Sequence, residues 1–285
     1  MTTLYHYCTA STFHSIIARK SIWLSSLSMS NDAMEGKLIS DIMNKMALDD
    51  GLDSILFAEL NSALAAWERI VDGLGICLSK EGDLLSQWRG YAGDAAGFSI
   101  GFDHSYLREL ANSIIDENDR IVQLKEMRYD NDVHKDVVKK IYEEIKKELI
   151  SGPLKGPVNA FAIYASEEAR EAYEKDVEAA RLSLIQNMAS RVVLPLYTLK
   201  NPGFAEEREW RLLAIVFGLD GCSFRAAANK IIPYQEYTLL TLSKPGINRV
   251  ILGPKNPTPI RVVERFLKSN GFESVEVLSS KLTYR

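Results

Sequence analysis

Apolar and polar residues alternate over short runs at the start of the chain, which is typical of half-buried strands. The runs "LYHYC" (Leu4–Cys8) and "SIWLSS" are two such segments. Between them, Phe13, Ile16 and Ile17 recur at i, i+3 and i+4 behind a Thr-Ala-Ser turn, and this spacing predicts a short amphipathic helix. The N-terminal segment is therefore predicted to run strand, polar turn, helix, strand.

The middle of the chain has a helical period instead. In "NDVHKDVVKKIYEEIKKELI" an apolar residue stands at every fourth position from Val133 to Leu149, and Lys and Glu fill the other faces. The Gly and Pro residues of "SGPLKGP" end this helix. Similar helical patterns cover residues 35–70 and 166–191. These patterns predict helical insertions at approximately 35–70 and 131–192.

Further short apolar runs predict the strands of a core. "LGICLS", "GFSIGFD" and "RIVQLKEMRY" stand between the helical segments, and the last third carries "VVLPLYTL", "REWRLLAIVF", "IIPYQEYTLL", "RVILG" and "SVEVLS". A helix from about Pro259 to Ser269 separates the last two strands. No repeat or low-complexity segment divides the chain. We therefore predict a single α+β domain over 1–285, with a mixed, mostly antiparallel β core and helices inserted between its strands.

The amino-acid composition argues against several classes of protein. The chain has 285 residues, of which 46% are hydrophobic and 25% charged, as in ordinary globular proteins. Its net charge of −4 provides no broad basic field, so stable binding of nucleic acid is not expected. The three cysteines and four histidines are scattered, so no disulfide framework and no metal site are expected. "MTTLYHYCTA" lacks a secretory signal pattern and no apolar run reaches the ~20 residues of a membrane span, which together predict a cytoplasmic protein.

Charged residues stand directly before one apolar run, in "EREWRLLAIVF". In a strand, Glu207, Glu209 and Arg211 would share one face, with the two carboxylates about 7 Å apart. Because an unpaired charge at the edge of a core is costly, these groups must bind one another, another charge or a ligand. Two interpretations stay open: a structural ion-pair network that includes Arg89, and a catalytic pair of carboxylates.

Two further segments carry candidate binding residues. His6 stands in the first strand before the hydroxyl-rich turn at Thr9, and such a donor-rich notch suits a ribose or an amide. In "QWRGYAGDAAGFSIGF", Trp88 and Tyr91 flank Arg89, so aromatic rings for stacking accompany a guanidinium for phosphate. Each feature also has a structural interpretation, as a hydrogen-bonded histidine of a strand or a tryptophan that fills the core. The glycine spacing here is not that of a dinucleotide-binding fingerprint.

Several of these blocks occur together in known families. "LYHYCTASTFHSIIARKSIWLSS", "LSQWRGYA…GFSIGFD", "EREWRLL" and "VILGPK" resemble a bacterial family of domains of unknown function, whose members carry "LYHYTS…LWLS…ND..E", "QWR.YA…GF.IGF" and "E.EWR". More remotely, a strand with His, a Thr/Ser turn, a short helix, a "W-L-S" strand and a late strand with Glu resemble the ADP-ribosyltransferase superfamily. Tyr7 follows His6 directly, where that superfamily usually has a small residue.

The remote resemblance implies an ADP-ribosyltransferase-like fold that binds NAD as its substrate. His6 would hold a ribose, Trp88 or Tyr91 would stack on nicotinamide, and Arg89 or Arg211 would meet the pyrophosphate. The implied binding residues are His6, Thr9, Ser25, Trp88, Arg89, Tyr91 and Arg211.

The same resemblance implies that Glu209, with Glu207 beside it, is catalytic. A fixed carboxylate at the ribose stabilises the oxocarbenium-like state that forms as the bond to nicotinamide breaks. We therefore expect an NAD-dependent ADP-ribosyltransferase-like enzyme, as a toxin or defence effector, with an unknown macromolecular acceptor. The alternative is a non-catalytic module that binds a nucleotide or a peptide. A nuclease or phosphoesterase would need a clearer Asp/His metal cluster.

Overall fold

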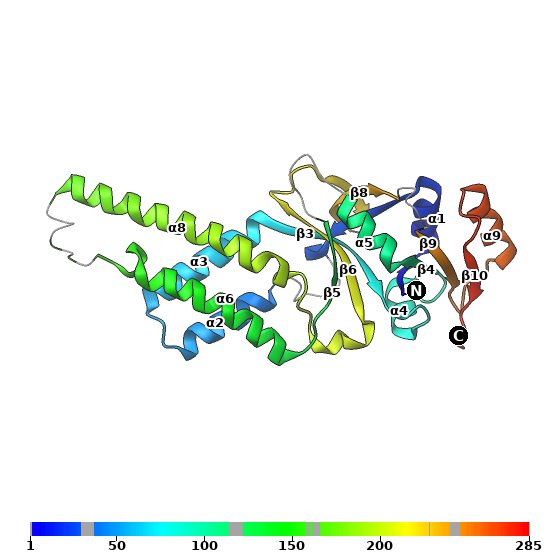
Figure 1. Ribbon diagram of the computed structural model, residues 1–285, viewed down its shortest axis with the longest axis horizontal. Coiled ribbons are helices and arrows are strands. Elements are labelled where there is room, and N and C mark those ends of the chain that lie inside the picture. Colours follow the sequence, from blue (N-terminus) through cyan, green and yellow to red (C-terminus); the bar gives the residue numbers. More distant parts are fainter. Residues whose placement is uncertain are drawn as a thin grey trace.

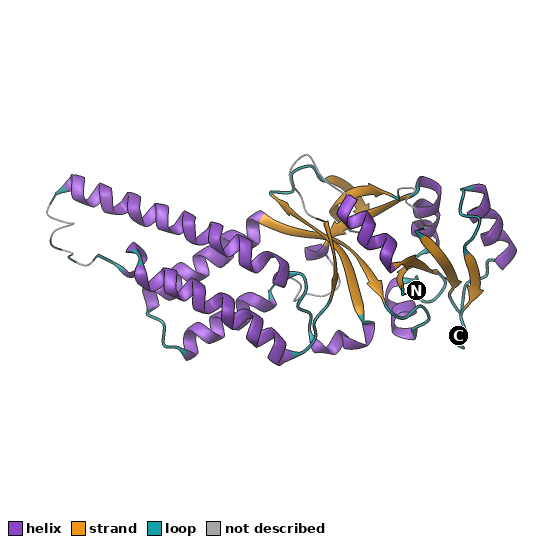
Figure 2. Ribbon diagram, in the orientation of Figure 1, coloured by secondary structure: helices purple, strands orange, loops and turns teal. Residues whose placement is uncertain are grey.

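A twisted sheet with helices on both faces forms one part of the molecule, and a bundle of long helices extends from it (Figure 1; Figure 2). The computed structural model describes residues 2–29, 37–113, 122–157, 159, 161, 166–227, 229–239 and 246–284. The strands are β1 (Thr3–Cys8), β2 (Ser21–Ser26), β3 (Val71–Ser79), β4 (Phe98–Asp103), β5 (Val122–Glu126), β6 (Glu209–Phe217), β7 (Ser223–Ala227), β8 (Lys230–Thr238), β9 (Ile247–Leu252) and β10 (Glu276–Ser279). The helices are α1 (Ala10–Arg19), α2 (Leu38–Asp49), α3 (Ser54–Ile70), α4 (Leu85–Tyr91), α5 (His104–Ser113), α6 (Asn131–Ser151), α8 (Glu167–Leu196) and α9 (Ile260–Ser269).

The described strands belong to one sheet. Its order is β10-β9-β4-β1-β3-β2-β8-β7, with β6 paired to β3 and β5 paired to β6. β9 and β10 are parallel, whereas the other pairs of these strands are antiparallel. The predicted α+β class with a mixed, mostly antiparallel sheet is therefore confirmed.

Strand β3 is the branch point of the sheet. On one edge it pairs with β6 along its whole length. On the other edge it pairs with β2 near its middle, where Gly75 lies opposite Ser25, and with β1 at its end, where Ser79 lies opposite Tyr5. Because β1 and β2 diverge between these points, residues 76–78 of β3 have no ladder partner on this edge among the described strands.

Strand β6 is covered on both sides, as its continuous apolar sequence predicts. Leu212, Ala214 and Val216 lie in a core that includes residues of α1, α5 and α9. Leu213 lies in a second core, formed mainly by α2, α3, α6 and α8. The second core joins the helical bundle to the sheet (Figure 1). The bundle helices lie in, or within a few residues of, the two ranges in which helical insertions were expected.

One segment expected as a strand is helical. Most of "VVLPLYTL" forms the end of α8, which continues to Leu196. Leu184, Met188, Val192 and Leu196 recur every four residues and are all buried in the bundle core. Packing along this helical stripe therefore outweighs the strand preference of the β-branched residues. Helix α5 and strand β7 are additions to the elements predicted from sequence.

Gly97 lies where the loop after α4 meets β1. Its N–H donates to the Ala92 carbonyl (2.8 Å), and an added Cβ would stand 2.2 Å from the Cys8 carbonyl oxygen. Since that obstacle is backbone, Gly97→Ala is expected to lower the free energy of unfolding by about 1–3 kcal/mol. Gly90→Ala, within α4 and with nothing within 4 Å of the added Cβ, is the control and is expected to be neutral or slightly stabilising. Urea denaturation with equal midpoints for the two variants would contradict this expectation.

Candidate functional site

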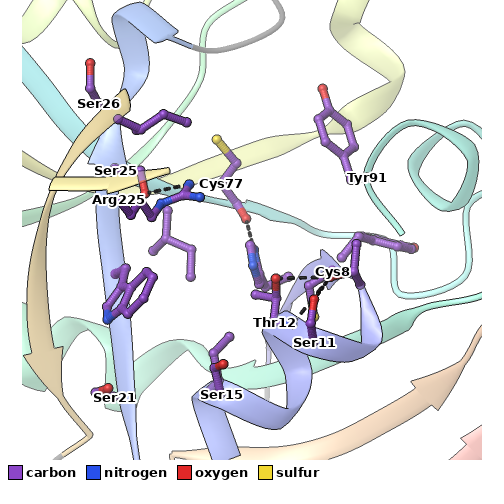
Figure 3. A pocket seen from close by; sticks show the side chains of 18 of the residues that line it. Cys8, Ser11, Thr12, Ser15, Ser21, Ser25, Ser26, Cys77, Tyr91 and Arg225 are labelled. Atoms are coloured by element: carbon purple, nitrogen blue, oxygen red, sulfur yellow. Dashed lines mark hydrogen bonds between the residues drawn. The ribbon is translucent and has the colours of Figure 1, made fainter. Parts of the chain in front are cut away.

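A pocket of about 510 Å³ lies where β1 and β2 diverge, a volume within the usual range of small-molecule sites. Its lining includes Ile76 and Cys77 from the open edge of β3, and Gly75 where β3 meets β2. Residues of β1, α1, β2 and β7 form the surrounding walls (Figure 3). Strands β1 and β2 pair with β3 at different points along its length. The pocket therefore forms between them, because the sheet branches at β3.

Hydroxyl groups line the wall that α1 provides. Thr9 caps the helix by accepting the Thr12 N–H (3.3 Å), and its Oγ1 lies 2.9 Å from Ser11 Oγ and 3.2 Å from Thr12 Oγ1. Ser15, one turn further along, also lines the pocket, and Ser25 of β2 lines it as well. This helix start is the polar turn that the sequence predicted, and it gives the pocket a row of hydrogen-bonding groups.

His6 forms a hydrogen bond with the part of β3 that has no partner on this edge among the strands described. Its Nδ1 lies 2.9 Å from the carbonyl oxygen of Cys77, which belongs to the unpaired part of β3. A carbonyl oxygen only accepts, so Nδ1 carries the proton and Nε2 is left as an acceptor. Burial lowers the pKa of His6, against the opposing effect of the carbonyl, so the ring is neutral at neutral pH. His6 therefore offers a hydrogen-bond acceptor in a pocket rich in hydroxyl donors.

Four buried charged side chains form an ion-pair cluster next to this pocket: Lys200, Glu207, Glu209 and Arg211. Lys200 Nζ donates to Glu207 Oε2 (2.6 Å) and to Glu209 Oε2 (2.7 Å). Arg211 donates to Glu209 through Nε (2.7 Å) and Nη2 (3.1 Å). Two cations thus balance two carboxylates, as burial of charge requires. A structural ion-pair network is therefore present, with Lys200 rather than Arg89 as the added cation.

Cys77 and Tyr91 lie between the ion-pair cluster and the cavity. Both line the pocket (Figure 3). The Cys77 thiol is hydrogen-bonded to the Glu209 carboxylate, and the Tyr91 hydroxyl donates to Glu207 Oε1 (3.0 Å). The two carboxylates are only 3% (Glu209) and 8% (Glu207) exposed and are not part of the pocket lining. The candidate catalytic groups are therefore one side chain away from the cavity.

Protonation states follow from these contacts. Burial by itself would raise the pKa of Glu209, but the charges of Arg211 and Lys200 outweigh it and lower the pKa to about 2. Although Cys77 is exposed to the pocket, the protein groups packed around its thiol, and then the negative charge of Glu209, raise the pKa of Cys77. Burial and Glu207 likewise raise the pKa of Tyr91. At neutral pH Glu209 is thus ionised, whereas Cys77 is a protonated thiol and a weak nucleophile.

The expected strand geometry is wrong for Glu207. A 3-10 helix spans Pro202–Glu207, and Arg208 adopts a left-handed conformation (φ 44°), so β6 begins only at Glu209. Glu207 and Glu209 therefore do not alternate along one strand. They meet because both bind Lys200.

Of the binding residues expected from sequence, the pocket gathers His6, Thr9, Ser25 and Tyr91. Trp88 is fully buried, and its Nε1 donates to Asp83 (2.7 Å), which is the structural role of a core tryptophan. The Arg89 guanidinium lies over the ring of Tyr284, 5.7 Å from its centre, against the C-terminal segment. Arg211 is held in the ion-pair cluster. The structure therefore does not bring Trp88, Arg89 or Arg211 into the pocket lining.

The pocket lining also includes residues that were not among the sequence-based candidates, and those with charged, aromatic or thiol groups include Arg19, Trp23, Cys77 and Arg225. The alternation in "SIWLSS", where Ile22 and Leu24 are buried in the core, is a signal that could have identified Trp23 on the opposite face. Arg225 lies in β7, a strand that the sequence did not predict, so no pattern marked it.

Within the described ranges, no three His, Cys, Asp or Glu side chains are grouped so that they could hold a metal ion. In the same part of the chain, no helix combines the length and the apolar character that crossing a membrane requires.

Comparison with known proteins relates part of the chain to a family. Residues 87–212 match the family model described as "Protein of unknown function (DUF2971)". This segment contains Tyr91 and the whole ion-pair cluster, whereas His6 and the hydroxyl row lie before it. The match confirms the expected relation to a family of domains of unknown function. No curated protein and no solved structure matches the chain.

Proposed function

We propose that this chain, which carries a DUF2971 segment at residues 87–212, is an NAD-dependent ADP-ribosyltransferase-like enzyme. One observation carries the proposal: the pocket between β1 and β2 gathers His6, Thr9 and Ser25 from the N-terminal strand–helix–strand, and Glu209 lies directly behind its Cys77 wall. A volume of about 510 Å³ suits a ligand of the size of a nucleotide.

The pocket groups fit a ribose and its neighbours. In the proposal, Nε2 of neutral His6 accepts a hydrogen bond from a ribose hydroxyl, because its Nδ1 is already used on the Cys77 carbonyl. The hydroxyls of Thr9 and Ser25 donate to, or accept from, other polar atoms of the nucleotide. Tyr91, 38% exposed at the pocket wall, is the aromatic residue available to the nicotinamide ring.

The proposed reaction breaks the C–N bond between ribose and nicotinamide. The bonding electron pair leaves with nicotinamide and positive charge develops on the ribose. A nucleophilic atom of an acceptor then bonds to the same carbon and loses its proton to water. Ionised Glu209 would stabilise this positive charge. Since the Cys77 thiol now occupies the space beside Glu209, its side chain has to turn aside when the substrate binds. The acceptor is a macromolecule, and the activity would suit a toxin or a defence effector.

Release of nicotinamide from NAD, with a cell lysate as the source of acceptors, tests the proposal. We expect release by the unmodified protein, and a rate lowered by roughly 10²–10³ in Glu209→Gln, as for the loss of a preorganised electrostatic group. Glu206→Gln is the matched control, since Glu206 is an exposed carboxylate in the adjoining 3-10 helix, and it should keep the activity. Thermal melting of each variant separates loss of activity from loss of folding. A folded protein that releases no nicotinamide with any acceptor would exclude the enzyme.

A non-catalytic nucleotide-binding or sensor module is the second candidate, and the enclosure of Glu209 favours it. Both carboxylate oxygens of Glu209 are already bound, to Arg211 and Lys200, and the side chain is 3% exposed. Calorimetric titration with NAD distinguishes the two functions. Binding without nicotinamide release would identify the module, whereas binding with release would identify the enzyme.

A further inference from the structure

The pocket carries positive charge although the chain as a whole has a net charge of −4. Among the described residues that line it, Arg19 and Arg225 are charged at neutral pH, and none is Asp or Glu. These two arginines come from the end of α1 and from β7, far apart in sequence. A pocket with this lining is suited to an anionic ligand.

Trp23 brings the two arginines to one place. The guanidinium carbon of Arg19 lies 5.5 Å, and that of Arg225 6.0 Å, from the centre of the Trp23 ring. Trp23 itself stacks on Tyr234 of β8 at 4.3 Å between ring centres, so its position is fixed by the sheet. Cation–π contacts therefore hold both guanidinium groups at the same end of the pocket.

Arg225 has unused hydrogen-bonding capacity there. Its guanidinium reaches into the cavity beside Ser25, to which Nη2 donates at 3.3 Å (Figure 3). Its Nε is buried and has no hydrogen-bond partner. Within the part of the chain that the structure describes, neither Arg19 nor Arg225 forms an ion pair. A buried donor without a partner is costly, and an anionic oxygen would satisfy it.

The carboxylate of Glu236 lies beside Trp23, and it is already engaged. Glu236 of β8 stands opposite Trp23 in the β2–β8 ladder and accepts the Ser21 hydroxyl (2.5 Å). Hydrogen bonds from Ser21 and Trp23, and the charge of Arg19, lower the pKa of Glu236, so it is ionised at neutral pH. Two guanidinium groups against one carboxylate leave an excess of positive charge.

From these contacts we propose that Arg19 and Arg225 form a clamp for the phosphate groups of a nucleoside diphosphate ligand. The inference rests on the proposed nucleotide-binding function of the pocket and places the phosphates at the Trp23 end. Guanidinium groups bind phosphate oxygens through paired N–H donors, and Ser25 adds a hydroxyl beside them. Arg19 and Arg225 thereby take the role that the resemblance to ADP-ribosyltransferases implies for Arg89 or Arg211.

Calorimetric titration with ADP-ribose, ADP and adenosine tests the clamp. We expect Arg225→Gln to weaken the binding of ADP-ribose and ADP by about 10- to 100-fold, since a charge-assisted hydrogen bond is lost. Arg19→Gln, at an exposed position where folding is not at risk, should weaken both by about 10-fold. Affinity for adenosine, which has no phosphate, should change by less than about 3-fold in either variant. Lys20→Gln is the matched control, because it removes the same charge one residue from Arg19 and outside the pocket lining.

The outcomes separate this inference from the proposed function. Binding of ADP-ribose and ADP that depends on both arginines supports the clamp, whether or not NAD is cleaved. If Arg19→Gln and folded Arg225→Gln bind or cleave NAD as the unmodified protein does, the clamp is overturned. The proposed function is then unaffected. Failure of the unmodified protein to bind any of the phosphate ligands overturns the clamp. Equal losses for the phosphate ligands and adenosine would also overturn it, because the arginines would then act through the shape of the pocket.

Discussion

Replacing Lys200 with methionine is expected to lower the free energy of unfolding by about 3–5 kcal/mol, the usual cost of breaking a buried ion pair by removing one partner. Lys200 is 6% exposed and binds Glu207 and Glu209 at 2.6 and 2.7 Å. Without it, Arg211 is the remaining cation of the ion-pair cluster and faces two buried carboxylates. Methionine has a similar length and no charge, so the variant isolates the loss of charge from the loss of volume. Urea denaturation at neutral pH measures the change.

A matched variant at the surface sets the scale for this loss. Lys80 and Glu126 are paired at 2.5 Å, as closely as the buried pairs, but their side chains are 40% and 52% exposed. Lys80→Met is therefore expected to cost at most about 1 kcal/mol. In the Lys200→Met background, Glu207→Gln should recover part of the stability, because it removes the carboxylate left unbalanced. Similar losses for Lys200→Met and Lys80→Met, or no recovery in the double variant, would show that the cluster is not an electrostatic unit.

The sequence predicted that Glu207 and Glu209 have partners, but it did not identify Lys200 as the cation that binds both. The sequence required partners for Glu207 and Glu209 because they stand at the edge of a core, and partners are present. It suggested Arg89, whereas the chain uses Lys200, which follows the end of α8. Its position is fixed by a short parallel bridge, in which the Lys200 N–H donates to the Arg128 carbonyl (2.9 Å). Such a contact between distant segments leaves no periodic pattern in the sequence.

Some pocket residues could likewise be predicted from local sequence patterns, whereas others could not. His6, Thr9 and Ser25 belong to one continuous strand–helix–strand, whose local pattern predicts each element, and all three line the pocket. Cys77 and Arg225 reach it because β3 branches and β7 and β8 extend the sheet beyond β2, and these are non-local features. Trp88 and Arg89 were expected there because an aromatic ring and a guanidinium suit a nucleotide, but on the seven-residue helix α4 Trp88 binds Asp83 in the core and Arg89 lies over Tyr284. Arg89 and Tyr91 are two positions apart on this helix and therefore face different sides, whereas Trp88 is separated from the pocket by its burial in the core.

Acid is expected to destabilise the protein through Glu209, on the order of 3 kcal/mol between about pH 4.5 and about pH 2. Burial would raise the pKa of this carboxyl, but Arg211 and Lys200 lower it from 4.5 in the unfolded chain to about 2 in the folded protein. A group whose pKa is lower in the folded state binds more protons when the chain unfolds. Its contribution is therefore complete above about pH 4.5, and it is lost as the pH falls toward about 2.

Comparison with Glu209→Gln isolates this contribution from that of the other carboxylates. Glutamine cannot be protonated in this range, so the difference in unfolding free energy between the unmodified protein and Glu209→Gln should be largest at neutral pH. It should shrink steadily below about pH 4.5, because the protonated carboxyl then resembles the amide. Urea denaturation over this pH series measures the difference, with Glu206→Gln as the exposed control that differs little from the unmodified protein throughout. A difference that stays constant with pH would mean that the pKa of Glu209 is the same in the folded and unfolded states, so that Arg211 and Lys200 do not stabilise its charge. The two cations would then not stabilise the charged carboxylate on which the proposed reaction depends.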